Sequence, residues 1–341
     1  MNKFKLALGA AVAVASLGFM TGCAQGEADG VADNGNGTIY FIPIVDTGAY
    51  WNPMRAGAEA TADRLGWNLV VQTTPPTEPQ KNERHIGFVN SAVANNAAGI
   101  AVAPIEANMF RNPIRDAMDA GIPVITFDAD LNDSEDRTAY VGTDNVLAGE
   151  VLGRNGAQEM LEQGITEGAI AIVTVDRTQP TMIAREEGIR RGFAEVMGEY
   201  ADNFRFLETI QDDDQAAISM EQLSGQILAN DDLVTVFSLG SEGPNIGVME
   251  ALSTQGRAGE ILHFGFDWTP TWEQGIADGR ITGIVAQDPW NIGVQVIEQL
   301  VRAIEGEEIP DNLPIDAVFV RAQDIMAHGE LIEEQQTVTT E

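Results

Sequence analysis

From residue 38 onward, short apolar runs alternate with longer segments whose apolar residues recur at helical spacing. The short runs predict buried strands, and the longer segments predict amphipathic helices. Repeated strand–helix order predicts a parallel sheet covered by helices on both faces. The first half of the chain is expected to hold strands at Thr38–Ile44, Asn68–Val71, Gly99–Ala103 and Pro123–Phe127, and helices at Asn52–Leu65, Lys81–Ala94 and Met109–Ala120.

The alternation then starts again, which predicts a second lobe of the same kind. Within the first lobe, Val124–Phe127 is expected to be the last core strand, and the crossover to the second lobe is expected near Gly142–Asn145. Thr269 and Pro270 fit the start of a helix, as N-cap and first helical residue. The second lobe is expected to hold strands at Ala169–Val175, Arg205–Ile210, Val234–Leu239, Ile261–Gly265, Ile281–Ala286 and Ala317–Arg321, and helices at Thr181–Met197, Gln215–Leu228, Asn245–Gln255, Thr269–Ala277 and Trp290–Ile304.

The N-terminal segment differs from the rest of the chain. Lys3 and Lys5 precede an apolar run that ends at Met20, and small residues lead to Cys23, the only cysteine. This pattern is typical of a secretory signal over residues 1–22, and a cysteine at the cleavage site resembles a bacterial lipobox. We expect Cys23 to carry a lipid and residues 23–37 to form a flexible tether. The alternative is ordinary signal cleavage, with Cys23 as a free thiol.

The charge narrows the classes of partner. The chain has 52 acidic and 19 basic residues, a formal net charge of −33. Such a surface repels phosphates, which argues against nucleic acid and anionic lipid as partners. After residue 5 the only lysine is Lys81.

Candidate binding residues follow the predicted strands. In open α/β sheets, ligands bind beyond the carboxyl ends of the strands. Aromatic rings, carboxylates, an arginine and a glutamine are expected to gather there. Rings suit the apolar faces of a sugar, and charged groups make strong hydrogen bonds to its hydroxyls. The candidates are Tyr50, Trp51, Asp128, Arg185, Ser241, Asp267 and Gln287.

Evidence for catalysis is weaker. His85, His263 and His328 are the only histidines, and none follows a predicted strand. The sequence has no nucleophile elbow, phosphate-binding loop or His/Cys metal cluster, so we expect no enzyme activity, no cofactor and no metal. Two alternatives stay open. Asp128 and Asp267 would suit a retaining glycosidase if they lay about 5–5.5 Å apart, and residues 130–136 could hold calcium, although they lack the EF-hand spacing.

Each candidate also has a structural explanation. The two aspartates could cap helices or brace turns, and Arg185 could pair with Glu186 or Glu187. The rings of Tyr50 and Trp51, and of Trp268, Trp272 and Trp290, could belong to the core. The remaining acidic groups are expected to be solvated surface charge: Asp130, Asp133, Glu135, Asp136 and Asp212–Asp214.

The sequence resembles the type I periplasmic sugar-binding proteins, the ribose-binding-protein-like solute receptors of ABC importers. The likeness runs from about Thr38 to Arg321, and the order and spacing of its motifs are more specific than any single motif. The motifs are Tyr50-Trp51-Asn-Pro-Met-Arg-Ala-Gly-Ala, Ala-Gly-Ile-Pro-Val-Ile-Thr-Phe-Asp128, Tyr-Val-Gly-Thr-Asp144-Asn145, Arg185-Glu-Glu-Gly188, Phe-Gly-Phe-Asp267 and Val-Ala-Gln287-Asp-Pro.

The resemblance implies two doubly wound parallel-sheet lobes joined by a multi-strand hinge. The implied lobes are residues 38–143 plus 288–316 and residues 144–287 plus 317–329, with a polar tail at 330–341. Rings after the first strand would stack on a sugar, and Asp128, Arg185, Asp267 and Gln287 would bind its hydroxyls. Closure of the lobes over the ligand would precede docking on a membrane permease.

The N-terminal segment and the resemblance together imply the setting. The protein would be a monomer outside the cytoplasm, held at the membrane only by its N-terminal lipid. A receptor that presents a sugar or furanosyl signal to a sensor kinase is the alternative role, and a secreted glycosidase is a weaker one. Two positions depart from the ribose pattern: Ala129 replaces an arginine, and Gly240-Ser241 replaces an asparagine. The segment ending at Glu78 resembles relatives that bind rhamnose or furanosyl signals, so the ligand stays open.

Overall fold

The computed structural model describes residues 36–337 except 46, 76 and 241. The predictions for the signal peptide, for Cys23, for most of the tether and for Ser241 therefore lie outside the described residues. For residues 332–337 only the backbone is described.

The first lobe is built on a parallel sheet. Within the described residues this sheet has six strands in the order β12-β5-β4-β3-β1-β2, and every neighbouring pair is parallel. Strands β1, β3 and β4 are short, apolar and almost completely buried, as expected for strands covered on both faces. The bounds are β1 Thr38–Ile42, β2 Asn68–Val71, β3 Gly99–Val102, β4 Val124–Phe127, β5 Ala139–Thr143 and β12 Asn312–Ile315.

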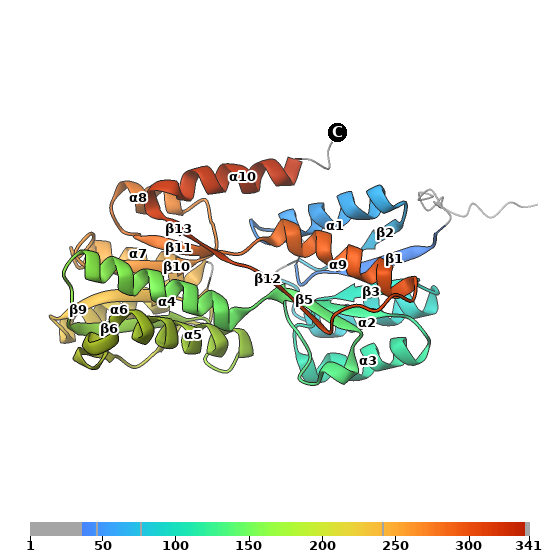
Figure 1. The fold of residues 1–341 in the computed structure, drawn as a ribbon, viewed down its shortest axis with the longest axis horizontal. Coiled ribbons are helices and arrows are strands. Elements are labelled where there is room, and N and C mark those ends of the chain that lie inside the picture. Colours follow the sequence, from blue (N-terminus) through green and yellow to red (C-terminus); the bar gives the residue numbers. More distant parts are fainter. Residues whose placement is uncertain (1–35, 46, 76, 241, 338–341) are drawn as a thin grey trace, which may run out of the picture. The chain divides into compact units, whose positions relative to one another are not determined.

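Helices cover both faces of this sheet (Figure 1). One face packs against α1, Trp51–Leu65, and α9, Pro289–Ile304, around a core that includes Phe41 and Phe127. The other face packs against α2, Lys81–Ala94, and α3, Ala107–Asp119. The loops at the carboxyl ends of the strands are thereby held on a rigid base.

The second lobe repeats the design. Its sheet has the order β13-β11-β10-β9-β6-β7 among the described residues, with β8 paired to β6, and only β13 is antiparallel. Helices α4 and α5 cover one face, and α6 and α7 cover the other. The strand bounds are β6 Gly168–Thr174, β7 Phe204–Phe206, β8 Ile210–Gln211, β9 Leu233–Ser238, β10 Leu262–Phe266, β11 Gly283–Ala286 and β13 Val318–Arg321.

The remaining helices complete this lobe, and three short 3-10 turns link elements along the chain. A small core around Trp268 and Trp272 lies beside α8 and α10. The helix bounds are α4 Asn145–Glu162, α5 Pro180–Met197, α6 Ala216–Ala229, α7 Gly243–Thr254, α8 Trp272–Ala277 and α10 Ile325–Thr337, and the 3-10 turns are Ser134–Asp136, Gly198–Asn203 and Ala322–Asp324.

The chain passes between the two sheets three times within residues 36–337: from β5 to α4, from β11 to α9 and from β12 to β13. The predicted fold class, α/β with two parallel-sheet lobes, is confirmed. Both lobes present the carboxyl ends of their inner strands beside these connections, which is where the candidate residues were expected.

Helices α4 and α5 pack unusually closely. Gly149 and Gly153 on α4 face Gly188 and Gly192 on α5, and a Cβ at any of these glycines would overlap a backbone carbonyl of the other helix. A Cβ at Gly149 would overlap the carbonyl of Arg185. This contact fixes the position of the Arg185 backbone relative to α4.

The structure corrects several predicted elements. Val124–Phe127 is not the last core strand, because β5 follows it and pairs with it. The single strand expected at Arg205–Ile210 is two strands, β7 and β8. Helix α8 begins at Trp272, and the Thr269 hydroxyl bonds the Thr271 hydroxyl instead of capping a helix at Pro270.

Helix α10 runs through Glu330, where the sequence predicts a polar tail to begin. It contacts α1 of the first lobe and α8 of the second. Gly329 lies against the indole of Trp268, where a Cβ would overlap the ring. Tertiary contacts of this kind stabilise a helix that carries little apolar pattern of its own.

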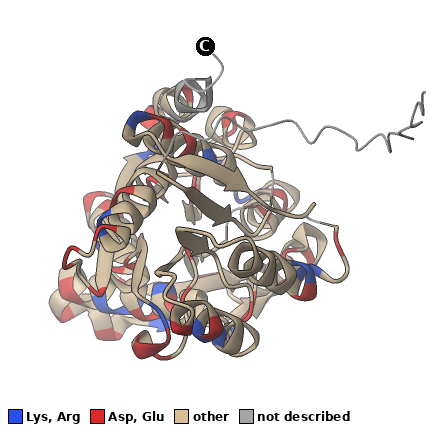
Figure 2. Ribbon diagram, turned by 90° about the vertical axis from the view of Figure 1, so that its right-hand side faces the viewer, with Lys and Arg blue, Asp and Glu red and all other residues tan. Residues whose placement is uncertain are grey.

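None of the helices among the described residues combines the length and the apolar character needed to cross a membrane. Asp and Glu residues are spread over many helices and loops, with Lys and Arg residues among them (Figure 2).

Candidate functional site

A cleft of about 1310 Å³ is lined by residues of both lobes, and we call it the interlobe cleft. Its lining follows the carboxyl ends of β1, β3 and β4 in the first lobe and of β6, β9, β10 and β11 in the second. Six of the seven predicted binding residues line it: Tyr50, Trp51, Asp128, Arg185, Asp267 and Gln287. The seventh, Ser241, lies outside the described residues.

A chain of side-chain hydrogen bonds connects the candidates of the two lobes. The Tyr50 hydroxyl donates to Asp128 Oδ1 at 2.6 Å and lies 3.4 Å from Gln287 Oε1. The Gln287 amide in turn donates to Asp267 Oδ1 at 2.8 Å. Both carboxylates therefore have one oxygen engaged by the protein, and their orientation is fixed before any ligand arrives.

The two aspartates sit on matching turns. Asp128 directly follows β4 and Asp267 directly follows β10, with φ angles of 62° and 61°. The Asp128 amide donates to the Val141 carbonyl, and the Asp267 amide donates to the Val285 carbonyl. Of their two structural explanations, helix capping is wrong, because the carboxylates bond Tyr50 and Gln287 instead of a helix terminus. Both residues do lie in turns, as the other explanation has it.

Burial controls the protonation of these groups. Burial raises the pKa of Asp128 to about 6, although the hydrogen bond from Tyr50 and the charge of Arg185 oppose that rise. Burial also raises the pKa of Asp267, opposed by Arg185 and by Gln287. The pKa of Tyr50 is raised by burial and by the neighbouring Asp128, so its hydroxyl stays a donor.

Arg185 is only 5 % exposed and is held within the second lobe. Its Nη1 donates to the Leu239 carbonyl at 2.7 Å, and its Nε donates to Asn145 Oδ1 at 3.0 Å. The guanidinium lies 4.2 Å from the ring centroid of Phe266. The predicted alternative, pairing with Glu186 or Glu187, is wrong, because those carboxylates pair with Arg190 and Arg191.

The aromatic candidates have different roles. The rings of Tyr50 and Trp51 meet edge to face, with centroids 5.3 Å apart, and both line the cleft. Trp272 is fully buried, and its indole Nε1 donates to the Asp267 carbonyl at 2.8 Å. Trp272 is therefore core, as its structural interpretation predicted, and it also supports the turn that carries Asp267.

Two residues in the cleft lining were missed from the sequence. Tyr140, on β5, donates its hydroxyl to the Asp128 carbonyl at 3.1 Å, and Asn145 accepts from Arg185. Tyr140 belongs to the Tyr-Val-Gly-Thr motif, but that motif indicated only a hinge. Its side chain meets Asp128 because β5 pairs with β4, which was not predicted.

The acidic segment after Asp128 is less solvated than predicted. Arg137 has a side-chain exposure of 2 % and pairs with Asp130 at 2.7 Å. Asp136 is 3 % exposed and pairs with Arg111 at 2.5 Å. Asp212 is also fully buried, where it accepts hydrogen bonds from the Ser219 hydroxyl and from the Asp214 amide. All three carboxylates brace loops, and Asp136 and Asp212 are shielded from water.

The cleft is negative. Lys81 and Arg185 are the only basic residues in its described lining, which also carries Glu106, Asp128, Asp130, Asp144, Asp176, Asp214, Glu242 and Asp267. Among the described residues, no group of three His, Cys, Asp or Glu side chains is placed to hold a metal ion. His263 does not line the cleft; its ring lies 2.8 Å from the Ser238 hydroxyl, and burial lowers its pKa to about 4. The arrangement can bind a hydroxylated ligand by rings, carboxylates and a guanidinium.

Comparison with known proteins places these features in a group. The profile of the periplasmic binding protein domain matches residues 39–308. The ribose import binding protein of Salmonella typhimurium is 27 % identical over 287 residues, covering 84 % of this chain and 91 % of that protein.

Two solved structures are similar in fold. An ABC transporter solute-binding protein from Agrobacterium vitis, bound with α-D-tagatopyranose, has a TM-score of 0.72 and 25 % identity, with 84 % of this chain and 95 % of that chain covered. A periplasmic solute-binding protein from Actinobacillus succinogenes with bound D-allose has a TM-score of 0.74 and 23 % identity, with 85 % and 99 % covered.

Proposed function

The chain belongs to the periplasmic binding protein domain family, and on this premise we propose that it binds a monosaccharide or similar small polyol in the interlobe cleft. The protein then delivers this ligand to the permease of an ABC importer, outside the cytoplasm, and performs no chemical reaction on it. The relatives named above, which are import or solute-binding proteins for sugars, support this role.

One observation carries the proposal. Tyr50 donates to Asp128 and Gln287 donates to Asp267, and these two pairs meet where the Tyr50 hydroxyl lies 3.4 Å from Gln287 Oε1. Trp51 and Arg185 line the same cleft. Each carboxylate keeps acceptor capacity after these bonds, and the buried guanidinium adds donors. Hydroxyl groups of a sugar can both donate and accept, so they match this set, and the nearby rings suit its C–H faces.

The test is a thermal-shift screen of residues 24–341 over pentoses, hexoses, deoxysugars, inositols and furanosyl signals, followed by calorimetry. A true ligand at a hundredfold excess over its Kd stabilises the folded chain by about 2.7 kcal/mol. Asp128→Ala and Asp267→Ala should each weaken binding roughly ten- to hundredfold, because each removes a charged hydrogen-bond partner. Asp119→Ala, an exposed change in the same lobe as Asp128, is the matched control.

Two outcomes would overturn the proposal. If a folded sample responds to no sugar or polyol, the ligand belongs to another class. If the aspartate variants bind the identified sugar as tightly as Asp119→Ala does, the site is elsewhere. Release of chromophore from an aryl glycoside would instead favour the glycosidase.

We also propose that Cys23 is lipidated, that the chain acts as a monomer, and that the lobes divide at the predicted boundaries. The lipobox-like sequence before Cys23 supports the first point. Mass spectrometry of the N-terminal peptide from membranes tests it, because an unmodified Cys23 peptide would exclude the anchor.

A further inference from the structure

Asp128 has a strained backbone. Its φ is 62°, and the Ala129 amide donates to the Phe127 carbonyl at 2.7 Å, which makes Asp128 the central residue of a γ-turn. With positive φ this is the rare and strained form of the γ-turn. Such a conformation persists only where the surrounding structure holds it.

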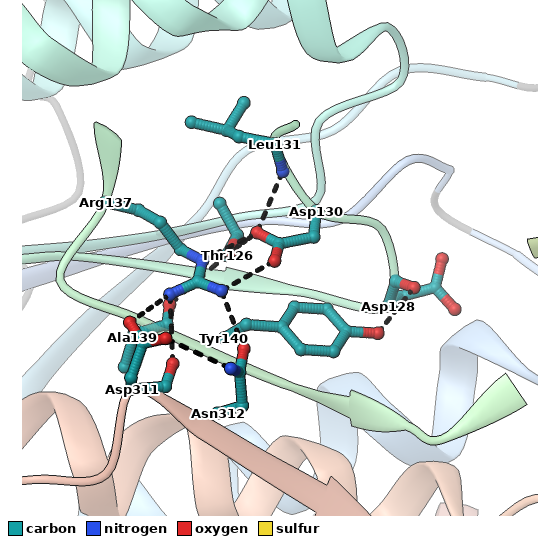
Figure 3. Close-up of polar contacts among 9 residues, drawn as sticks. All are labelled: Thr126, Asp128, Asp130, Leu131, Arg137, Ala139, Tyr140, Asp311 and Asn312. Atoms are coloured by element: carbon teal, nitrogen blue, oxygen red, sulfur yellow. Dashed lines mark hydrogen bonds and ion pairs between the residues drawn. The ribbon is translucent and has the colours of Figure 1, made fainter. Parts of the chain in front are cut away.

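Tyr140 holds this turn from the neighbouring strand. Its hydroxyl donates to the Asp128 carbonyl at 3.1 Å (Figure 3). The Asp128 amide donates to the Val141 carbonyl at 3.2 Å, and the Tyr50 hydroxyl engages the carboxylate. The main chain of the turn is thereby fastened to β5 through both its amide and its carbonyl.

The lack of a side chain at Gly142 leaves space for the Tyr140 ring. A Cβ at Gly142 would overlap the Tyr140 hydroxyl, because both residues lie on the same face of β5. The ring can therefore lie along the strand toward the cleft, which it lines. A larger residue at 142 would turn the hydroxyl away from Asp128.

Arg137 anchors the base of this arrangement. Its Nε and Nη2 donate to the two oxygens of Asp130, both at 2.7 Å, and its Nη1 donates to the Asp311 carbonyl at 2.9 Å (Figure 3). Its guanidinium carbon lies 6.0 Å from the Tyr140 ring centroid. Asp130 follows Asp128 by two residues, so the arginine holds the far side of the same turn.

The anchor also joins two strands that lead to the second lobe. The Asp311 carbonyl accepts from the Tyr140 amide at 2.9 Å as well as from Arg137. Tyr140 pairs with Asn312 in the β5–β12 ladder, and Arg137 Nη2 donates to Asn312 Oδ1. The residues that hold Asp128 are therefore those that align β5 with β12.

We propose that Tyr140 is a positioning residue for ligand binding: its hydroxyl holds Asp128 in the strained turn, and Arg137 fixes both residues against β12. This proposal rests on the proposed function, because it assigns Tyr140 a role through the carboxylate that meets the ligand.

The test measures Kd for the identified sugar in Tyr140→Phe, which removes only the hydroxyl. Binding should weaken roughly two- to tenfold, as expected for one lost hydrogen bond. Tyr40→Phe is the matched control, because Tyr40 lies on β1 of the same sheet, its hydroxyl accepts from Asn95 at the end of α2, and it does not line the cleft. Tyr40→Phe should leave Kd unchanged.

A double-mutant cycle separates positioning from a general structural effect. If Tyr140 acts through Asp128, adding Tyr140→Phe to Asp128→Ala should change Kd by less than twofold. Equal loss in both backgrounds would overturn the proposal. So would unchanged binding by Tyr140→Phe while wild type binds the sugar.

Arg137→Lys gives a second readout, because lysine keeps the charge and loses the paired geometry. Arg137→Lys should raise Kd for the sugar when Asp128 is present. When it is added to Asp128→Ala, it should change Kd by less than twofold. Equal weakening in both would mean that Arg137 supports only the fold. Failure of wild type to bind any sugar would overturn the proposed function itself, so the two failures are distinguishable.

Discussion

Asp128 and Asp267 each stand at a position where the backbone conformation favours glycine but the cleft uses a carboxylate. A left-handed backbone costs a residue with a Cβ about 1–2 kcal/mol, and glycine would avoid that cost. Both turns nevertheless carry aspartate, and both place the carboxylate in the hydrogen-bond chain of the cleft. The two lobes thus use the same device at corresponding strand ends.

The raised pKa of Asp128 predicts opposite pH effects on stability and on affinity. With a pKa of about 6 in the folded chain and 3.8 as its ordinary value, Asp128 holds a proton in the folded state that the unfolded chain has released between about pH 4 and 6. Its contribution to the free energy of unfolding therefore falls as pH rises through that window, by about 3 kcal/mol at most. Denaturant titrations of wild type and Asp128→Asn at pH 4 to 7 measure this difference.

Affinity should run the other way. A sugar hydroxyl donates best to an ionised carboxylate, so affinity should weaken as pH falls below 6, up to about tenfold per unit. Tyr50, Arg185 and Asp267 face Asp128 and are unchanged in Asp128→Asn, which should lose the part of this dependence that Asp128 contributes and keep the part from Asp267, whose pKa is also raised. Parallel pH profiles for the two proteins would contradict the assignment.

At the residue scale, the sequence predicted which residues line the cleft better than it predicted which side chains are buried. Six predicted residues do line the cleft, because strand ends and residue types are local information. The predicted exposure of Asp136 and Asp212 was wrong, because each is buried beside a partner that the loop pattern does not indicate, and Asp130 is partly buried beside Arg137. Tyr140 was missed for the same reason.

At the scale of elements, the α4–α5 contact carries the main structural consequence. Glycines on both helices allow backbone-to-backbone contact, and that contact sets the position of Arg185 in the cleft. If Arg185 binds the ligand as proposed, glycines that do not line the cleft help to set the binding geometry.

Gly149→Ala tests this dependence. The added Cβ would overlap the Arg185 carbonyl, so the helices must separate, and we expect a loss of about 1–3 kcal/mol in the free energy of unfolding together with weaker sugar binding. Gly225→Ala on α6 is the matched control, because its Cβ would meet no atom within 4 Å. That change should be neutral or stabilising by up to about 1 kcal/mol. Equal stability of the two variants, by urea denaturation, would contradict the packing argument.

Most elements could be predicted from periodicity, but β5 and β12, which lie side by side in the first sheet, could not. β5 contains Gly142, and β12 reads Asn-Leu-Pro-Ile, so neither has a long apolar run. Pairing with each other stabilises these two strands. Tertiary contacts also decide where α8 begins: the helix starts at the buried Trp272 and not at the Thr269-Pro270 signal.

At the scale of the whole molecule, charge selects the class of ligand. The described cleft lining carries eight carboxylates against Lys81 and Arg185, and the chain as a whole has a net charge of −33. A negative cleft repels anions. Salt weakens this repulsion, with a Debye length of about 10 Å at 0.1 M ionic strength.

We therefore expect the protein to discriminate against acidic sugars. Once a neutral sugar ligand is identified, its uronic acid or its phosphate ester should have a Kd at least about tenfold higher than that of the neutral sugar at low salt. The difference should shrink as salt is raised, which calorimetry at 0.05 M and 1 M sodium chloride can measure. A methyl glycoside of the same sugar controls for added bulk. Tighter binding of the acid at low salt would contradict this view.

The scarcity of lysine has a practical consequence for this cleft. Lys81 opens α2 and lines the cleft, and no other lysine follows residue 5. In a chain cut after residue 22, amine-reactive dyes can reach only this side chain and the α-amino group, which titrates about two to three pH units lower. The α-amino group can therefore be blocked first near neutral pH, and labelling at higher pH then directs one fluorophore to Lys81, beside the proposed ligand site. A dye can thus be placed at this cleft without an engineered cysteine.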